Sequence, residues 1–265
     1  MMEPCGLVTL TTDFGVKEPY AGVVKGVIFS ANPNARIVDI THDIPAHNIV
    51  NAAFTLSRSY DYFPQGTVHV AVVDPEVGGK RLNIAVKTDR HFFVGPDNGI
   101  FSLVLAREKN VEIREIKNPV FKLERVSSTF HGRDVYAPCA GRLSAGENFS
   151  DVGPVVTQLS KLVYPKVQQE GNILTGEIVL VDSFGNLITN ISRQSLQSFT
   201  GKKKFGIYFG GERFFEIKDH YSEVPKGMPL VLFGSSGYLE ISMNEGNAAS
   251  YFMTSTGSTV TVRRL

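Results

Sequence analysis

The chain has 265 residues, 42% of them apolar, which is enough for one large or two modest domains with hydrophobic cores. The formal net charge is +1 and the longest basic run is Lys202–Lys204, so the sequence lacks the electrostatic footprint of a nucleic-acid-binding protein. No apolar run approaches the roughly 20 residues that a membrane-spanning helix needs.

Residues 1–150 alternate strand-like and helix-like segments. This alternation predicts an α/β domain with a mostly parallel central sheet that helices cover on both faces. Apolar runs predict strands at Leu7–Thr12, Arg36–Ile40, Val68–Val73, Leu82–Thr88, His91–Val94 and Val111–Ile116, the fourth and fifth forming a hairpin. Helical periodicity predicts helices at Pro19–Ala31, Ile49–Tyr60, Gly99–Ala106 and Gly132–Ser144.

The pattern changes near residue 165, where a polar stretch from Tyr164 to Asn172 predicts a linker. After it the helical periodicity ends, and short alternating runs between glycine-rich turns predict an all-β, barrel-like domain without helices. The predicted strands are Leu174–Val181, Leu187–Ile191, Lys204–Phe209, Arg213–Ile217, Pro229–Phe233, Leu239–Met243 and Thr259–Val262. We therefore divide the chain into an α/β domain at residues 1–165 and a β-barrel domain at residues 166–265.

The cysteines point to a reducing compartment. Cys5 and Cys139 are far apart in sequence and suit neither a disulfide framework nor a zinc site. The N-terminus lacks a basic segment followed by an apolar core, so we expect no signal peptide. These features predict a soluble cytoplasmic protein that binds neither nucleic acid nor a membrane.

Asp74 and Arg81 form the first candidate site. Asp74 ends the apolar run Val68–Val73, and a Pro/Gly loop follows that ends on Arg81. Ligands of open α/β sheets bind at the carboxyl ends of strands, so an acid and a returning cation at this place favour chemistry. The alternative is an exposed ion pair that contributes about 0–1 kcal/mol and has no function.

Two further residues occupy similar positions. Asp13 follows the strand Leu7–Thr12, where a carboxylate can accept two hydrogen bonds from a vicinal diol such as a ribose. The alternative is an aspartate of an ordinary turn or one that caps the helix beginning at Pro19. His131 begins the helix Gly132–Ser144, where the helix dipole disfavours the protonated ring, although a purely structural histidine is the alternative.

His42, Asp43 and His47 bring two imidazoles and a carboxylate together in sequence. With Asp74 they form the ligand set of a possible metal-dependent hydrolase. Pro45 lies between the two histidines, however, so their spacing matches no helical metal-binding motif.

The second domain contains two turns with candidate binding residues. Asp182 and Asn186 offer an acceptor for an ammonium group and an amide for a carboxylate, which together complement an amino acid. The same residue types are common in an ordinary β-turn. Ser235 lies in a Gly/Ser turn whose backbone amides could bind an anion.

Taken together, these segments resemble one family, the S-adenosylmethionine hydroxide adenosyltransferases, which are hydrolase relatives of fluorinase and chlorinase. The resemblance extends over nearly the whole chain. The segments that carry it are Thr11–Gly15, Ile40–Ile44, Val73–Arg81, Gly95–Gly99, Phe130–Asp134, Asp182–Asn190 and Ser235–Glu240.

The resemblance implies an α/β domain, a β-barrel domain and a homotrimer in which substrate lies between the N-terminal domain of one subunit and the C-terminal domain of its neighbour. It implies hydrolysis of S-adenosyl-L-methionine to adenosine and L-methionine without a cofactor or a metal. Asp74, Arg81 and His131 would position the attacking water or hydroxide, and Asp13 would hold the ribose hydroxyls.

The remaining implied contacts lie in the second domain. Asp182, Asn186 and Ser235 would hold the methionine end of the substrate. The backbone of Met243 and Asn244, with Glu240 nearby, would lie near the adenine or the amino-acid moiety.

Three alternatives to this hydrolase remain at the level of sequence. A halide-using relative is disfavoured, because the Asp74 carboxylate would repel an anion at the position of the nucleophile. A metal-dependent hydrolase of a nucleoside-type substrate would use His42, Asp43, His47 and Asp74. A module that binds adenosine or S-adenosylmethionine without catalysis would not depend on Asp74 for function.

Overall fold

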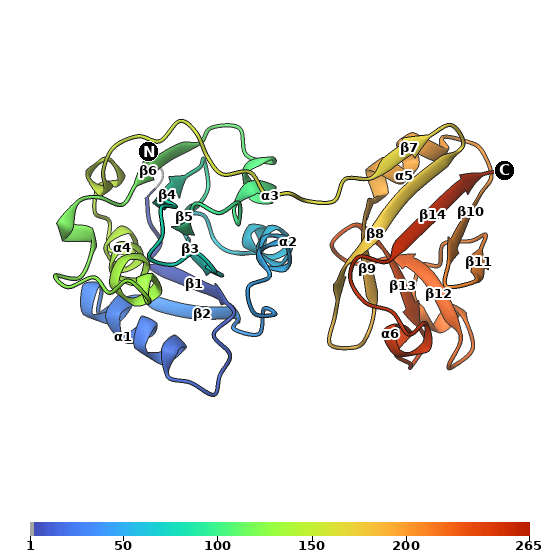
Figure 1. Ribbon diagram of the computed structural model, residues 1–265, viewed down its shortest axis with the longest axis horizontal. Coiled ribbons are helices and arrows are strands. Elements are labelled where there is room, and N and C mark those ends of the chain that lie inside the picture. The colour runs from blue at the N-terminus through green and yellow to red at the C-terminus, as the bar shows by residue number, and fades with distance from the viewer. Residues whose placement is uncertain (1–2) are drawn as a thin grey trace. The chain divides into compact units, whose positions relative to one another are not determined.

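The computed structural model describes residues 3–265, and the chain divides into two compact units between Val163 and Tyr164 (Figure 1). Met1 and Met2, which belong to the predicted first domain, lie outside the described residues. Over residues 3–265, every helix is too short or too polar to cross a bilayer.

The first unit contains the predicted strands and helices in the predicted order. Its strands are β1 (Leu7–Thr12), β2 (Arg36–Thr41), β3 (Val68–Val72), β4 (Asn83–Lys87), β5 (Phe92–Pro96) and β6 (Glu112–Glu115). Its helices are α1 (Tyr20–Ala31), α2 (Ile49–Ser59), α3 (Ser102–Leu105) and α4 (Ala137–Ser144), with a π-helical turn, η3 (Gly132–Tyr136), directly before α4. Short 3₁₀ turns are η1 (Tyr60–Tyr62), η2 (Pro119–Phe121) and η4 (Phe149–Val152).

The central sheet is mixed, with the strand order β2-β1-β3-β5-β4-β6. β1, β2, β3 and β5 pair in parallel, whereas β4 runs antiparallel to both β5 and β6. The expected hairpin of β4 and β5 is confirmed, and Thr88 N–H donates to His91 O at 2.9 Å in its turn. The expectation of a mostly parallel sheet is thus met by the four strands β2, β1, β3 and β5, whereas both pairings of β4 are antiparallel.

Helices cover both faces of this sheet (Figure 1). One core packs Val24 and Ile28 of α1 and Leu143 of α4 against alternate residues of the strands, such as Leu10 and Val70. The opposite core packs residues of α2 and α3 against the intervening strand positions. Because successive strand residues point to opposite faces, the continuous apolar runs in the sequence follow from this two-sided burial.

The strand order reverses between β1 and β3. From β1 the chain moves outward through α1 to β2, then returns through α2 to β3 on the other side of β1. At such a reversal the connecting helices lie on opposite faces, which leaves a crevice at the carboxyl ends of the two strands. Asp13 and Asp74 follow β1 and β3 at this edge.

The second unit is built on an antiparallel, nearly closed, barrel-like sheet. Its strands are β7 (Gln168–Glu170), β8 (Ile173–Val181), β9 (Leu187–Ser192), β10 (Phe205–Phe209), β11 (Glu212–Phe214), β12 (Pro229–Phe233), β13 (Tyr238–Met243) and β14 (Thr259–Arg264). The order is β11-β10-β14-β8-β9-β13-β12, with β7 beside β8. Lys218 N–H, beyond β11, donates to Val231 O of β12 at 2.8 Å, which brings the two ends of the sheet together.

Two expectations about this unit are wrong. The unit contains the helices α5 (Arg193–Thr200) and α6 (Ala248–Tyr251) and a 3₁₀ turn, η5 (Tyr221–Glu223), and β7 lies inside the expected linker. Ser192 starts α5 by accepting the Ser195 N–H at 3.0 Å, and Leu196 and Phe199 are buried in the core. In a helix this short the hydrophobic residues repeat too few times for their helical spacing to be distinguished from the alternation of a strand.

Two histidines lie side by side in the core of the first unit. His69 Nδ1 is 2.8 Å from Thr9 Oγ1, and the rings of His69 and His91 are centred 5.0 Å apart. Both side chains are fully buried. Burial lowers the pKa of His91 to about 4 and the pKa of His69 well below its ordinary value, so both rings are neutral at pH 7.

We expect the free energy of unfolding of the first unit to fall as pH falls from about 6.5 to about 4. Over this range the unfolded chain binds protons at these histidines that the folded chain does not, so the loss should reach roughly 2 kcal/mol or more. Urea titrations followed by circular dichroism at several pH values measure it. His91→Gln should flatten the slope and His220→Gln, at an exposed histidine, should not; equal slopes in wild type and His91→Gln would contradict the prediction.

Candidate active site

Asp13, Asp74 and His131 line one cavity of about 140 Å³ in the first unit. Thr12 of β1 lies opposite Val72 of β3, so both acids leave neighbouring parallel strands at nearly the same level. Phe14 and Phe130 form part of the same lining. The structure therefore brings together three of the residues that were predicted separately from the sequence.

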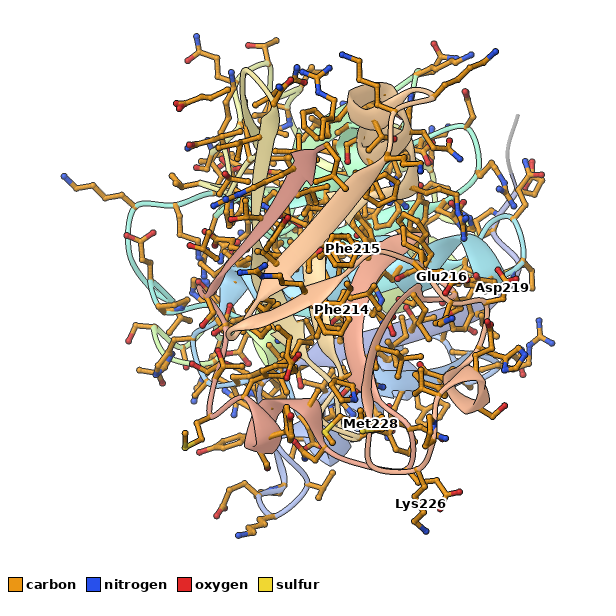
Figure 2. All side chains as sticks on the ribbon, turned by 90° about the vertical axis from the view of Figure 1, so that its right-hand side faces the viewer. Phe214, Phe215, Glu216, Asp219, Lys226 and Met228 are labelled. Carbon is orange, nitrogen blue, oxygen red and sulfur yellow. The ribbon has the colours of Figure 1, made fainter. Side chains whose placement is uncertain are left out.

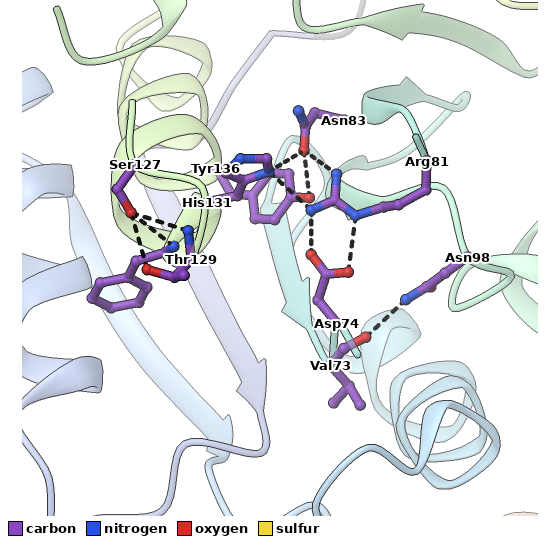
Figure 3. Close-up of polar contacts among 10 residues, drawn as sticks. Val73, Asp74, Arg81, Asn83, Asn98, Ser127, Thr129, His131 and Tyr136 are labelled. Carbon is purple, nitrogen blue, oxygen red and sulfur yellow. Dashed lines mark hydrogen bonds and ion pairs between the residues drawn. The ribbon is translucent and has the colours of Figure 1, made fainter. Parts of the chain in front are cut away.

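Asp74 and Arg81 form a buried, two-pronged ion pair (Figure 3). Arg81 Nε donates to Asp74 Oδ1 at 2.8 Å, and Arg81 Nη2 donates to Asp74 Oδ2. The side chains are only 4% and 5% exposed, so the alternative of an exposed surface pair is wrong. A pair withdrawn from water in this way needs each charge to be matched, because the desolvation cost of either ion alone is several kcal/mol.

The loop after Asp74 is held by its own turns. Val77 N–H donates to Asp74 O at 3.3 Å and Gly79 N–H to Glu76 O at 2.9 Å. Gly78 has a φ of +78°, and a Cβ there would overlap the Ser128 carbonyl oxygen, so only glycine fits. These tight turns return the chain to the same edge of the sheet and place Arg81 against Asp74.

Asn98 fixes the strand end from the other side. Its Nδ2 donates to Val73 O at 2.8 Å (Figure 3). The bond satisfies a backbone carbonyl immediately before Asp74 and thereby limits movement of the carboxylate.

Asn83 and Tyr136 join the ion pair to His131, and neither was predicted from the sequence. Arg81 Nη2 lies 2.9 Å from His131 Nδ1, and Arg81 Nη1 donates to Asn83 Oδ1 at 2.6 Å. Tyr136 OH donates to the same Asn83 oxygen at 2.7 Å (Figure 3). Asn83 follows Arg81 by two residues at the start of a strand, a spacing that places both side chains on one face and could have signalled it.

The π-helical turn Gly132–Tyr136 positions His131. In a regular α-helix the N–H of residue 138 would donate to the carbonyl of Asp134, but Pro138 has no N–H. The Asp134 carbonyl instead accepts a hydrogen bond from Leu123 N–H at 2.8 Å. In a π turn hydrogen bonds join residues five apart, which is the spacing of His131 and Tyr136. Burial and the nearby Arg81 guanidinium lower the pKa of His131, so its ring is neutral at pH 7.

Asp13 is held by the backbone of a neighbouring loop rather than by a helix. Its Oδ2 accepts the His47 N–H at 3.0 Å, and His47 has a φ of +66°, which is uncommon for a residue with a Cβ. Helix α1 is preceded by Pro19 without a side-chain cap, so the helix-capping interpretation of Asp13 is wrong.

The metal cluster of the alternative hydrolase is not assembled. His42 Nδ1 is 2.8 Å from Thr12 Oγ1 and its Nε2 is 3.1 Å from Asp39 Oδ1, whereas Asp43 and His47 are exposed. Within residues 3–265, no group of three His, Cys, Asp or Glu side chains is arranged to hold a metal ion. That activity needs no metal stays a prediction.

The second unit contains a larger pocket of about 580 Å³. Among the predicted binding residues, Asn186 and Met243 line it. Phe184 and Tyr221 contribute aromatic surface, and Phe184 is 75% exposed. An open pocket with two aromatic rings and a buried amide suits a flat, partly polar ligand.

Asp182 orders the turn that carries Asn186. Its Oδ1 accepts the N–H groups of Phe184 and Asn186 at 2.9 and 2.8 Å, and its Oδ2 accepts Asn186 Nδ2 at 2.9 Å. The β-turn interpretation of this segment is therefore confirmed. The same bonds fix the orientation of the Asn186 amide in the pocket.

Ser235, Glu240 and Asn244 lie in different surroundings. Ser235 is exposed in a turn closed by the Gly237 N–H to Gly234 O bond of 2.9 Å. Glu240 is buried beneath this turn and accepts Tyr221 OH at 3.4 Å.

The Asn244 backbone bonds to the turn before β12, where Lys226 and Met228 lie at the lower end of the view in Figure 2. Asn244 N–H donates to Met228 O at 3.1 Å, and Gly227 N–H donates to Asn244 O at 2.8 Å. The contacts of Ser235, Glu240, Met243 and Asn244 with a ligand stay predictions.

Residues 8–153 match the SAM hydroxide adenosyltransferase N-terminal domain, and residues 176–261 match the SAM hydroxide adenosyltransferase C-terminal domain. The chain belongs to the SAM hydroxide adenosyltransferase family, as the resemblance in sequence indicated.

Several relatives are similar over most of their length. A protein of Thermus thermophilus named (R)-S-adenosyl-L-methionine hydrolase is 36% identical over 244 residues, covering 89% of this chain and 91% of the relative. A protein of Methanocaldococcus jannaschii with the same name is 35% identical over 254 residues, covering 92% and 90%. A fluorinase of an Actinoplanes species is more distant, at 23% identity over 97% of each chain.

Among solved structures, an uncharacterised conserved protein from Thermotoga maritima superposes with a TM-score of 0.90 at 35% identity. The match covers 97% of this chain and 100% of that chain. The fold is thus shared with a protein of similar length.

We expect Asp74→Ala to destabilise the first unit by about 3–5 kcal/mol, because it leaves the Arg81 guanidinium buried without a counter-charge. The matched control is Asp61→Ala, which removes an exposed pair with Arg90 and should cost less than about 1 kcal/mol. Urea unfolding measures both values. A cost for Asp74→Ala no larger than that of the control would contradict the buried-pair interpretation.

Proposed function

We propose that this protein hydrolyses S-adenosyl-L-methionine to adenosine and L-methionine, by in-line attack of water or hydroxide on C5′ with methionine as leaving group. The observation that carries the proposal is the joined set of Asp74, Arg81 and His131 beside Asp13. Relatives about 35% identical over most of the chain bear the name of such a hydrolase.

The sulfonium of the substrate supplies the leaving group, because its departure yields a neutral thioether. The enzyme then has to hold a water about 3–3.5 Å from C5′ in line with the C–S bond and keep other water away. The C5′–S bond breaks as the C5′–O bond forms, the electron pair stays on sulfur, and one proton leaves the attacking water. Formation of adenosine and methionine therefore releases one proton.

Asp74, Arg81 and His131 act as a unit on that water. Arg81 supplies a permanent positive charge where hydroxide character develops. Asp74 already accepts two hydrogen bonds from Arg81, and its carboxylate oxygens have lone pairs left to accept a further hydrogen bond from water. His131, neutral at pH 7, orients the same water.

The rest of the substrate would be held by the other candidate residues. Asp13, with one oxygen on the His47 N–H, binds the ribose hydroxyls. The candidates of the second unit are assigned to the methionine and adenine ends: Asp182, Asn186, Ser235, Glu240, Met243 and Asn244.

We extend the proposal to the assembly. Candidate residues for one substrate are divided between the two units of the chain, and the family resemblance implies a homotrimer with substrate at the subunit interfaces. The protein would act in the cytoplasm without a cofactor or a metal. Size measurement in solution with and without adenosine tests the trimer, and a monomer under both conditions would contradict it.

Turnover in oxygen-18 water tests the reaction. The label should appear in adenosine and not in methionine, because water attacks C5′, and activity should survive EDTA. Label in methionine would contradict attack at C5′, and loss of activity in EDTA that zinc or magnesium restores would favour a metal-dependent hydrolase. Incubation with chloride should yield no 5′-chloro-5′-deoxyadenosine, which separates the hydrolase from a halide-using relative.

Substitutions test the site. Asp74→Asn preserves size and should lower kcat by about 100-fold or more, as should Arg81→Ala and His131→Ala. Asp61→Ala, at an exposed residue outside the cavity lining, should keep wild-type turnover. Steady-state kinetics measure these values, and wild-type kcat in all three site variants would contradict the proposed mechanism. A wild-type protein that binds adenosine without turning over S-adenosyl-L-methionine would indicate a binding module instead of an enzyme.

A further inference from the structure

Three hydrogen-bonding groups surround a single oxygen, Asn83 Oδ1. Arg81 Nη1 is 2.6 Å away, Tyr136 OH is 2.7 Å away and His131 Nδ1 is 3.1 Å away. An amide oxygen has two lone pairs, so at most two of these groups can be its full partners. If His131 is the group that makes no hydrogen bond to Asn83 Oδ1, its Nδ1 needs no proton, and the proton of the neutral ring lies on Nε2.

Two of the three groups are permanent donors. The Arg81 guanidinium keeps its protons at every accessible pH. Tyr136 is fully buried, and burial raises the pKa of its hydroxyl well above the ordinary value, so it keeps its proton too. The amide nitrogen of Asn83 could not face these donors, which fixes the side chain with its oxygen toward them.

His131 Nδ1 has a further neighbour that favours a bare nitrogen. Arg81 Nη2 lies 2.9 Å away and can only donate, so an Nδ1–H would oppose another N–H at hydrogen-bond distance. With both lone pairs of Asn83 Oδ1 occupied by Arg81 and Tyr136, Nδ1 accepts from Arg81. A neutral ring that accepts at Nδ1 carries its proton on Nε2.

We propose that Asn83 and Tyr136 are positioning residues that hold Arg81 against His131 and thereby fix His131 as the Nε2–H tautomer. His131 lines the cavity, and its Nε2 is the ring nitrogen left for a ligand. In the proposed hydrolysis, on which this last step rests, His131 donates a hydrogen bond to the oxygen of the attacking water and accepts no proton from it. The proton leaves on the side of Asp74.

Tyr136 influences the tautomer of His131 because its hydroxyl occupies one lone pair of Asn83 Oδ1. Without its hydroxyl, Asn83 Oδ1 gains a free lone pair 3.1 Å from His131 Nδ1, and the Nδ1–H form finds an acceptor. Tyr136→Phe should therefore raise the population of the Nδ1–H tautomer. Tyr60→Phe is the matched control, because Tyr60 is also buried in the first unit and its hydroxyl donates to Glu108 instead.

The test is two-bond ¹H–¹⁵N correlation spectroscopy of protein labelled at its six histidines, with His131 assigned from the spectrum of His131→Gln. Wild type and Tyr60→Phe should show a bare Nδ1 and a protonated Nε2 at pH 7. Tyr136→Phe should shift both resonances toward the other tautomer and lower kcat about 10-fold with KM changed less than about 2-fold. A protonated Nδ1 in wild type, or an unchanged tautomer in Tyr136→Phe, overturns the proposal.

Asn83→Asp gives a second measurement if Tyr136→Phe does not fold. A carboxylate oxygen beside Nδ1 favours a proton there, so both ring resonances of His131 should shift toward the Nδ1–H form, and an unchanged tautomer overturns the proposal. The spectra need no substrate. Expected spectra in a protein that does not hydrolyse S-adenosyl-L-methionine would refute the proposed function and leave the tautomer assignment in place.

Discussion

The buried pairing of Asp74 with Arg81 is the interaction on which the rest of the site depends. Neither charge is stable in its position without the other, because both side chains are almost fully withdrawn from water. The strand end, the glycine loop, Asn83 and His131 all contact this pair and are arranged around it. The reversal of strand order between β1 and β3 provides the crevice, and the ion pair provides the charged groups that act on a ligand there.

Much of the fold of the first unit could be predicted because two-sided burial leaves continuous apolar runs and amphipathic helices in the sequence. Leu7–Thr12 agrees with β1 at both ends, whereas Gly99–Ala106 shortens to Ser102–Leu105 because Gly99 and Ser102 form a turn instead. The helix Arg193–Thr200 is not predicted from the sequence, because a helix of about two turns shows little periodicity among the neighbouring strands. Local patterns therefore predict long elements far better than short ones.

The candidate site was predicted unevenly, for a physical reason. Asp13, Asp74 and His131 occupy positions with a general meaning, strand ends and a helix start, and the structure gathers them at one cavity. Asn83 begins a strand and Tyr136 ends a helical turn. The two-residue spacing from Arg81 is the one local signal for Asn83, and a phenol in a helical turn carries none. Their contribution depends on tertiary contacts with Arg81 and His131, and such contacts leave no pattern in a single sequence.

The antiparallel course of β4 has a consequence for how the site assembles. A strand that starts at the carboxyl edge of the parallel strands allows Arg81 to meet Asp74 after only a short loop, whereas another parallel strand would begin at the opposite edge. Closing so short a loop costs little chain entropy, so the charge pair can form from neighbouring residues. His131 and Tyr136 approach from about fifty residues further along, so bringing them to the pair costs more loop-closure entropy than bringing Arg81 to Asp74.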